Sequence, residues 1–126
     1  MAKGDDLQER LVKLAAAVIL LCRTLPRDDG GGHVTGQILR SGTSPAPNYA
    51  EARGAESDRD FVHKLGIVLK ELNETIVWLQ IGLSSGLWTE EAVTGTLEEC
   101  RVLARIMAAS INTVKRRVGA LPGKGR

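Results

Sequence analysis

Aromatic side chains are scarce in this chain, and the scarcity limits both its core and its binding chemistry. Among 126 residues the only aromatic ones are Tyr49, Phe61, Trp78 and Trp88. Proteins that recognise RNA sequence stack unpaired bases on aromatic side chains. Four residues are too few to supply both a core and such a surface. We therefore expect an aliphatic core and no base-specific recognition.

The chain also has little cysteine and no long apolar run. Cys22 and Cys100 are its only cysteines, and each falls on the apolar face of a predicted helix. This placement favours two reduced, buried thiols over a disulfide or a reactive pair. The longest apolar run, residues 14–22, spans nine residues, which is too short to cross a bilayer. Because Asp5 and Asp6 precede it, the run is atypical of a secretory signal, and we expect a soluble cytoplasmic protein.

Apolar residues recur at alternating spacings of three and four, which is the repeat of helices that pack along a seam. The repeat predicts helices over residues 5–25 and 89–118, and a further helix that follows a polar turn over residues 55–60, with Ser57 or Asp58 as its cap, and ends near Ser84. No segment alternates with a period of two for long enough to form a strand. The seam of the first helix consists of Leu7, Leu11, Leu14, Val18, Leu21 and Leu25. The seam of the last helix consists of Val93, Leu97, Cys100, Ala104, Met107, Ile111, Val114 and Val118.

Another helix is predicted to begin near His33, after a loop that contains Gly30–Gly32, and two prolines interrupt it. Pro45 and Pro47 each remove a backbone N–H and press on the carbonyl four residues earlier. Ser44 is placed to cap a restarted helix. The fold class expected is all-α, an up-down-up-down antiparallel four-helix bundle with a proline-kinked second helix. Residues 1–121 form this single domain, and residues 122–126 a disordered tail.

Positive charge is concentrated at the C-terminal end. Residues 1–100 hold ten basic and fifteen acidic side chains, whereas residues 101–126 hold seven basic and no acidic ones. On the last predicted helix, Arg101, Arg105, Lys115 and Arg116 fall within about 100° of arc. Such a row can neutralise phosphates, although cations also favour helix C-termini and solvated faces without any ligand. The candidate nucleic-acid-binding residues are Arg101, Arg105, Lys115, Arg116 and Arg117.

Polar residues of the two central helices form a second candidate set. Glu71 and Glu74 lie one turn apart on one helix, and Arg40, Asn48 and Glu51 lie on the other. Carboxylates from two helices can form a metal or acid–base site, but the paired Glu-x-x-His repeats of di-iron bundles are absent from the sequence. We therefore expect no metal and no cofactor. The expected role is a structural network in which Arg40 pairs with Glu71 or Glu74 and fixes register within or between protomers.

Two blocks resemble a known family. RSGTSPAPNYAEA occupies residues 40–52 and DFVHKLGIVLKELNETIVWL occupies residues 60–79. They are similar to the four helix bundle proteins, also known as 23S rRNA intervening sequence proteins, which carry R-S-G-T-S-x-x-x-N-Y-x-E-A and then F-x-x-K-L-x-x-x-L-K-E-x-x-E-T-x-x-W-L. The chain departs from this pattern at Pro45 and Pro47, where relatives often have Val, Gly or Ala.

The resemblance implies a four-helix protomer that assembles into a homopentamer with a central channel. Some members of the family are encoded within insertions in large-subunit ribosomal RNA genes. Related members are accessory proteins of diversity-generating retroelements, in which a pentamer with a basic surface partners a reverse transcriptase and its RNA. No catalytic residues are established for the family.

These observations leave two hypotheses and a weaker third. The first is a non-enzymatic homo-oligomer that binds the backbone of RNA or DNA, or a nucleic-acid enzyme such as a reverse transcriptase, through its basic surface. The alternative is a structural or protein-interaction oligomer with no nucleic-acid role. A small-molecule enzyme is disfavoured because the sequence shows no convincing nucleophile, metal set or phosphate-binding loop.

Overall fold

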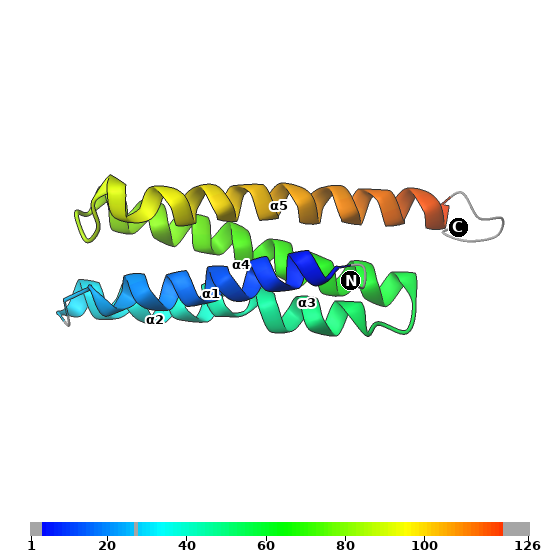
Figure 1. The fold of residues 1–126 in the computed structure, drawn as a ribbon, viewed down its shortest axis with the longest axis horizontal. Helices are drawn as coiled ribbons and strands as arrows, with labels where there is room; N and C mark the ends of the chain where they lie inside the picture. Colours follow the sequence, from blue (N-terminus) through cyan, green and yellow to red (C-terminus); the bar gives the residue numbers. More distant parts are fainter. Residues whose placement is uncertain (1–3, 27, 120–126) are drawn as a thin grey trace.

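The computed structural model describes residues 4–26 and 28–119, and this part of the chain is helical with no strand. Its helices are α1 (Asp5–Arg23), α2 (Asp29–Thr43), α3 (Pro45–Arg53), α4 (Asp58–Ser84) and α5 (Glu90–Gly119). A single residue separates α2 from α3, so these two segments form one of four helical arms that lie along a common long axis (Figure 1). The predicted all-α class and the four-helix bundle are confirmed. The predicted tail, residues 122–126, lies outside the described residues.

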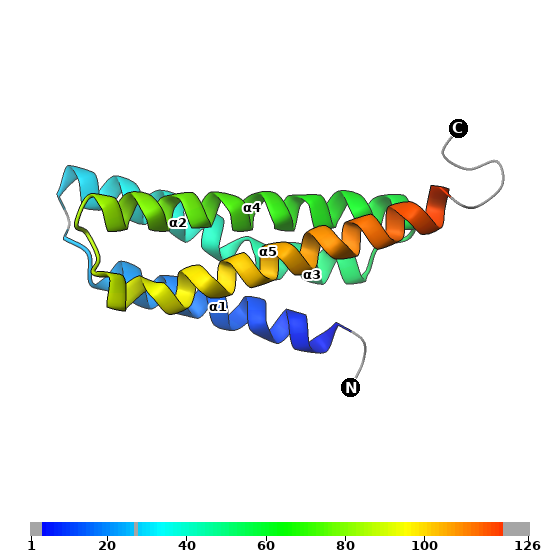
Figure 2. The same cartoon turned by 90° about the horizontal axis from the view of Figure 1, so that it is seen from above.

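The arms enclose an aliphatic core, as predicted. Leu11 and Val18 of α1, Leu65 and Leu72 of α4 and Met107 of α5 are completely buried. Helix α1 packs against α2, α3 and α5 but not against α4. Figure 2 accordingly shows α1 and α4 on opposite sides of the bundle. The outward faces of these two helices therefore point in different directions.

The second arm begins earlier than predicted, and Gly30–Gly32 belong to helix α2 rather than to a connecting loop. The Asp28 carboxylate caps this helix by accepting a hydrogen bond from the Gly31 amide at 2.7 Å. A Cβ on Gly31 would lie 2.2 Å from the Pro26 carbonyl oxygen. The capped helix start therefore passes so close to the preceding chain that only glycine fits there. Glycine spacing alone does not reveal such a contact.

The arm is interrupted at Ser44, where α2 ends at Thr43 and α3 begins at Pro45. The Ser44 hydroxyl does not cap α3 in the expected way, since it makes no bond to a backbone N–H. A capping side chain accepts from the second or third amide of a helix, and the third residue of α3 is Pro47, which has no N–H. Instead the Asn48 side-chain amide donates to the Ser44 hydroxyl at 2.8 Å and to the Ser44 carbonyl at 3.0 Å.

Helices α4 and α5 begin at side-chain caps and are linked by a turn that holds Trp88. Ser57 accepts a hydrogen bond from the Asp60 amide at 3.1 Å, and Thr89 accepts one from the Ala92 amide at 3.2 Å. Trp88 is buried, and its indole N–H donates to the Leu21 carbonyl of α1 at 3.2 Å. This indole therefore ties the turn between α4 and α5 to the end of α1.

Candidate nucleic-acid interface

Four of the five predicted nucleic-acid-binding cations lie in a row along the outer surface of α5. Lys115 and Arg116 are exposed, and neither makes an ion pair within residues 4–26 and 28–119. The Arg116 guanidinium donates to the Asn112 carbonyl at 3.4 Å, which leaves its charge without an acidic partner. These two residues are the strongest candidates for contact with phosphate.

Glu98 joins the N-terminal half of the row, and the sequence analysis missed it. Its carboxylate lies 4.0 Å from the Arg101 guanidinium and 3.9 Å from the Arg105 guanidinium. Glu98 precedes the acid-free segment by three residues, so the count over residues 101–126 excluded it. Its spacing of three and seven residues from the two arginines could have revealed the contact. Glu98 and Arg105 are exposed and Arg101 is partly exposed, so these long pairs are weak.

Arg117 lies apart from the row and contacts a different helix. Its guanidinium donates to the Asp58 carboxylate at the start of α4, at 3.1 Å. Because Arg117 follows Arg116 by 100° of helical rotation, its side chain turns toward α4 rather than along the row. The structure therefore brings Arg101, Arg105, Lys115 and Arg116 to one surface and assigns Arg117 an ion pair between helices.

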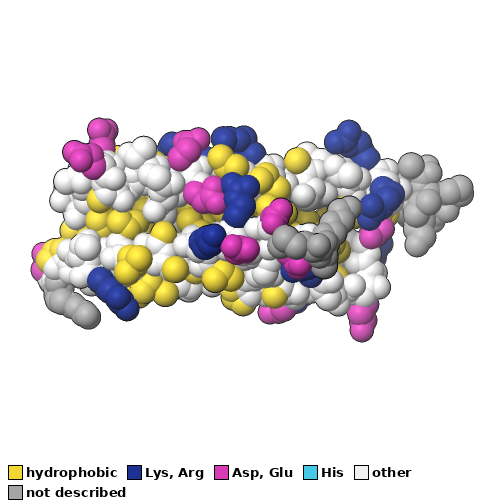
Figure 3. Space-filling view, in the orientation of Figure 1, with side chains coloured by type: hydrophobic (Ala, Val, Ile, Leu, Met, Phe, Trp, Pro, Cys, Tyr) yellow, Lys and Arg dark blue, Asp and Glu magenta, His cyan; other side chains and the backbone are white. Residues whose placement is uncertain are grey.

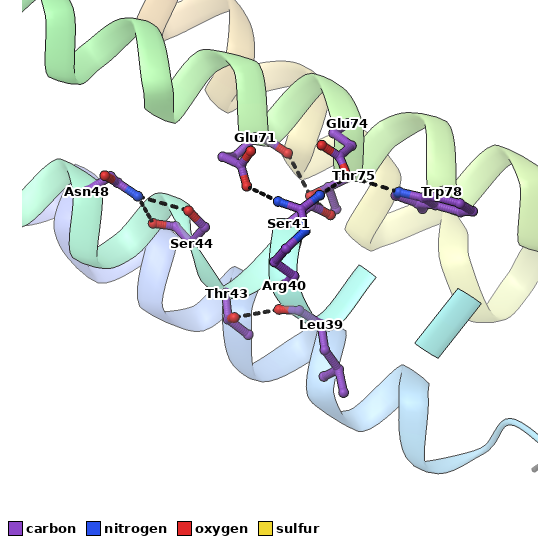
Figure 4. Close-up of polar contacts among 10 residues, drawn as sticks. All are labelled: Leu39, Arg40, Ser41, Thr43, Ser44, Asn48, Glu71, Glu74, Thr75 and Trp78. Atoms are coloured by element: carbon purple, nitrogen blue, oxygen red, sulfur yellow. Dashed lines mark hydrogen bonds and ion pairs between the residues drawn. The ribbon is translucent and has the colours of Figure 1, made fainter. Parts of the chain in front are cut away.

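The predicted polar network is centred on Arg40, which reaches from α2 to α4 (Figure 4). Its guanidinium donates to the Glu71 carboxylate at 2.8 Å and also pairs with the Glu74 carboxylate. The Glu71 side chain is only 9% exposed, so its charge depends on this partner. Glu74 also accepts a hydrogen bond from the Trp78 indole at 3.2 Å.

Two hydroxyl groups extend this contact into the core. The Thr75 hydroxyl donates to the Glu71 carbonyl at 2.8 Å and lies 2.9 Å from the Ser41 hydroxyl. Thr75 and Ser41 are completely buried. The other two predicted members lie elsewhere. Asn48 bonds to Ser44 within the second arm, and Glu51 pairs with Lys64 of α4 at 3.0 Å. The network that joins α2 to α4 is thus narrower than the predicted set.

Large apolar side chains remain exposed on the two helices that do not touch each other. On α1, Val12 is 53% exposed and Leu20 58%, with Ile19 beside them, and on α4, Val77 is 50% exposed and Ile81 41%. Figure 3 shows apolar side chains gathered along the α1 arm. Ile19 and Leu20 lie between the seam residues Val18 and Leu21, so α1 is apolar on more than one side. The α4 patch was not predicted, because its two members lie outside the α4 seam.

Both cysteines are buried and free. Burial raises the pKa of the Cys100 thiol to about 12, and it also raises the pKa of Cys22. These thiols are therefore protonated near neutral pH and poorly nucleophilic.

Within the described part of the chain, no cluster of three or more His, Cys, Asp or Glu side chains could hold a metal ion. No described helix is long and apolar enough to cross a membrane.

The features above define a class of protein: a small helical bundle with a cationic row on its last helix and apolar faces on two outer helices. The chain belongs to the 23S rRNA-intervening sequence protein family, whose model matches residues 6–109. The resemblance inferred from the two sequence blocks is thereby confirmed.

A solved relative has the same fold. The chain is similar to a protein with unknown function from the S23 ribosomal protein family of Bacteroides thetaiotaomicron VPI-5482, whose crystal structure is known. The two are 31% identical, the match covers 82% of this chain and 96% of that one, and the TM-score is 0.77. No curated protein matches the chain.

Proposed function

We propose that this chain is a non-enzymatic, cytoplasmic protein that assembles with copies of itself and binds the backbone of RNA or DNA through the α5 row. Its protomer in this proposal is an up-down-up-down antiparallel bundle with a proline-kinked second arm. The family resemblance suggests a homopentamer, and a reverse transcriptase that carries bound RNA as a further partner. The observation that carries the proposal is a pair of exposed cations, Lys115 and Arg116, which have no acidic partner among the described residues, on a protomer that also exposes two apolar faces.

The apolar faces support self-assembly. Val12, Ile19 and Leu20 on α1 and Val77 and Ile81 on α4 are all at least 39% exposed. Isolated exposed apolar residues are ordinary, but contiguous patches on a soluble protein mark interaction sites. Because the two faces lie on opposite sides, they favour contact between α1 of one copy and α4 of the next. A head-to-tail contact of this kind closes into a ring when the rotation between neighbours permits.

The charge of the α5 row supports binding to a phosphate backbone. Within residues 4–26 and 28–119, Lys115 and Arg116 have no acidic partner, and the pairs that Glu98 forms with Arg101 and Arg105 are long. Cations that neutralise phosphates release condensed counterions, so affinity falls steeply as salt rises. A ring repeats the row once in every copy and multiplies this effect. Binding of this type does not distinguish base sequence.

Fluorescence anisotropy with a labelled single-stranded RNA tests the proposal. We expect micromolar or tighter binding in 50 mM salt that is lost by 300 mM. The variant K115A/R116A is expected to weaken binding at least about tenfold and to flatten the salt dependence. The control R59A/K64A removes the same charge from α4, where Arg59 is exposed and Lys64 pairs with Glu51. Equal losses in both variants, or binding unaffected by salt, would contradict the role of the row.

A structural or protein-interaction oligomer without a nucleic-acid role is the second candidate. It is favoured by the acids beside three of the five cations, since Glu98 faces Arg101 and Arg105, and Asp58 pairs with Arg117. The variant E98Q separates the two candidates. If the row binds phosphate, removing this charge tightens RNA binding. An assembled protein that binds no RNA at 50 mM salt, with or without E98Q, identifies the second candidate.

A further inference from the structure

We infer that Arg23 of one copy inserts into an acidic, aromatic groove between α2 and α4 of the neighbouring copy, so that the groove is filled only on assembly. The inference rests on the proposed self-assembly and names the contact that sets its register. The groove lies between α2 and α4, and Arg23 lies in the last turn of α1, a helix that does not pack against α4. Each has chemistry that the other can satisfy.

The groove has a volume of about 620 Å³ and lies where α2 begins and α4 ends. Asp28, Asp29, His33, Trp78, Ile81 and Leu87 are among the residues that line it. The His33 ring meets the Trp78 ring edge-on, with centroids 5.6 Å apart. Among residues 4–26 and 28–119, no arginine or lysine lines the groove and neither aspartate forms an ion pair. The site therefore combines negative charge with an aromatic wall.

A guanidinium fits this combination better than any other side chain. Arginine pairs with carboxylates through a planar fork, stacks on indole faces and is weakly hydrated for a cation. Asp28 caps α2 through Oδ1, and its other carboxylate oxygen has no hydrogen-bond partner among the described residues. Asp29 is exposed at the first position of α2. A buried lysine would lose more hydration, and an anion would meet two carboxylates.

Arg23 extends the exposed apolar face of α1. It lies in the last turn of that helix, one turn beyond Ile19 and Leu20, and it is exposed. It makes no ion pair or side-chain hydrogen bond in the described part of the chain. Arginine is enriched among the residues that contribute most to protein interfaces, above all where it enters a pocket that excludes water.

The groove likewise adjoins the exposed face of α4. A second hollow, lined by Val77, Gln80, Ile81, Ser84 and Ser85, shares Ile81 and Ser85 with the groove. Apolar surface and acidic groove are thus continuous on this side. Along α1, the exposed apolar residues are followed by the cation Arg23. The two sides are complementary in both hydrophobicity and charge.

The C-terminal ends of α1 and α4 also lie at the same height along the long axis of the bundle. Trp88 donates to the Leu21 carbonyl of α1, and its ring lies so close to Gly82 of α4 that a Cβ there would be 2.2 Å away. One indole therefore holds the ends of α1 and α4 level. Figure 1 shows both helices running toward that end. Leu20 precedes Arg23, and Ile81 precedes Ser84, by the same three residues, or about 4.5 Å of rise.

If neighbouring copies are related by rotation about an axis parallel to the helices, residues at the same height in one copy stay at the same height in the next. This rotation brings Leu20 of one copy beside Ile81 of the next and Arg23 beside the groove. The same rotation makes a second match, because Glu9 and Lys70 each lie fourteen residues, about 21 Å, before the matched ends. Opposite charges thus meet near both ends of an apolar strip. In the part of the chain that the structure describes, Glu9 pairs with Lys13 of its own helix, through an exposed contact of 3.0 Å.

Charge exchange at the contact tests the inference by sedimentation velocity over a concentration series. The variants R23E and D29R are each expected to raise the dissociation constant of the assembly at least about tenfold. The double variant R23E/D29R is expected to return it to within about threefold of the wild type. Because D29R puts a cation at a helix start, D29N is included, and circular dichroism follows the helix content of each variant. The control R59E reverses an exposed charge on α4, beyond the level that α1 reaches, and is expected to assemble normally.

The outcomes separate this inference from the proposed function. Wild-type protein that stays monomeric at all concentrations refutes self-assembly and the contact together. Wild-type protein that assembles while R23E and D29N assemble equally well refutes only the contact. Failure of the double variant to recover, when both single variants are weakened and helical, also refutes the pairing of Arg23 with Asp29.

Discussion

Replacing Gly82 with alanine tests whether Trp88 fixes the geometry at the end of the bundle. Gly82 lies in the last turn of α4, where an added Cβ would be 2.2 Å from Cζ3 and 2.3 Å from Cε3 of Trp88. Real side-chain contacts do not occur at such distances, so the indole or the helix must move. Trp88 is 5% exposed and hydrogen-bonded to α1. Movement of the indole therefore disturbs three elements at once.

The expected cost follows from two opposing effects. Alanine stabilises a helix interior relative to glycine by about 0.5–1 kcal/mol. Overpacking a rigid core site costs about 1–3 kcal/mol. Because Gly82 lies near the end of α4, the gain in helix propensity is small. We expect G82A to lower the free energy of unfolding by about 1–2 kcal/mol.

Urea denaturation followed by circular dichroism measures this change. Protein concentration must be held constant, since assembly adds a concentration-dependent term to the stability. Gly95 on α5 is the matched control, because no atom lies within 4 Å of an added Cβ and the residue is exposed. G95A is expected to stabilise the protein by about 0.5–1 kcal/mol. A G82A variant as stable as G95A would refute the packing of Trp88 described above.

Two further predictions concern the buried polar groups. The variant R40M removes the cation that faces the buried Glu71 carboxylate, and it is expected to lower the unfolding free energy by about 1–3 kcal/mol. K64M, at the exposed pair with Glu51, is expected to change it far less. Equal effects in thermal or urea unfolding would contradict this ranking. Since burial raises the pKa of Cys100 to about 12, only the unfolded chain loses this proton between about pH 9 and pH 12. Stability should therefore fall by about 1.4 kcal/mol per pH unit across that window, and C100A should remove this part of the slope. An unchanged slope in C100A would show that the thiol ionises equally easily when folded.

The sequence was sufficient for the parts of the fold that periodicity determines. The apolar seams of the first, third and last predicted helices identify α1, α4 and α5 because a single buried stripe repeats along each helix. The predicted start of α2 was wrong for a local reason. Gly30–Gly32 have low helix propensity, but the Asp28 side chain caps the helical turn there, and Gly31 passes so close to the Pro26 carbonyl that no larger residue fits. A capping acid and a close approach of the backbone thus outweigh the low helix propensity of glycine.

The candidate site could also be predicted only in part. The α5 row could be placed from helical geometry, and the Arg40 contacts from charge and spacing on adjacent helices. The partners of Arg117 and Glu51 could not, because Asp58 and Lys64 reach them from other arms. The groove at the start of α2 was also beyond the sequence, since its lining comes from α2, α4 and the turn that follows α4.

The most direct test of the proposed function is sedimentation velocity of the wild-type protein mixed with a fluorescently labelled single-stranded RNA, at 50 and 300 mM salt. We expect the protein to sediment as an assembly in both, because apolar burial between α1 and α4 resists salt, and the RNA to sediment with it only at 50 mM. A protein that sediments as a single copy, or RNA that stays bound equally at both salt concentrations, would contradict the proposal.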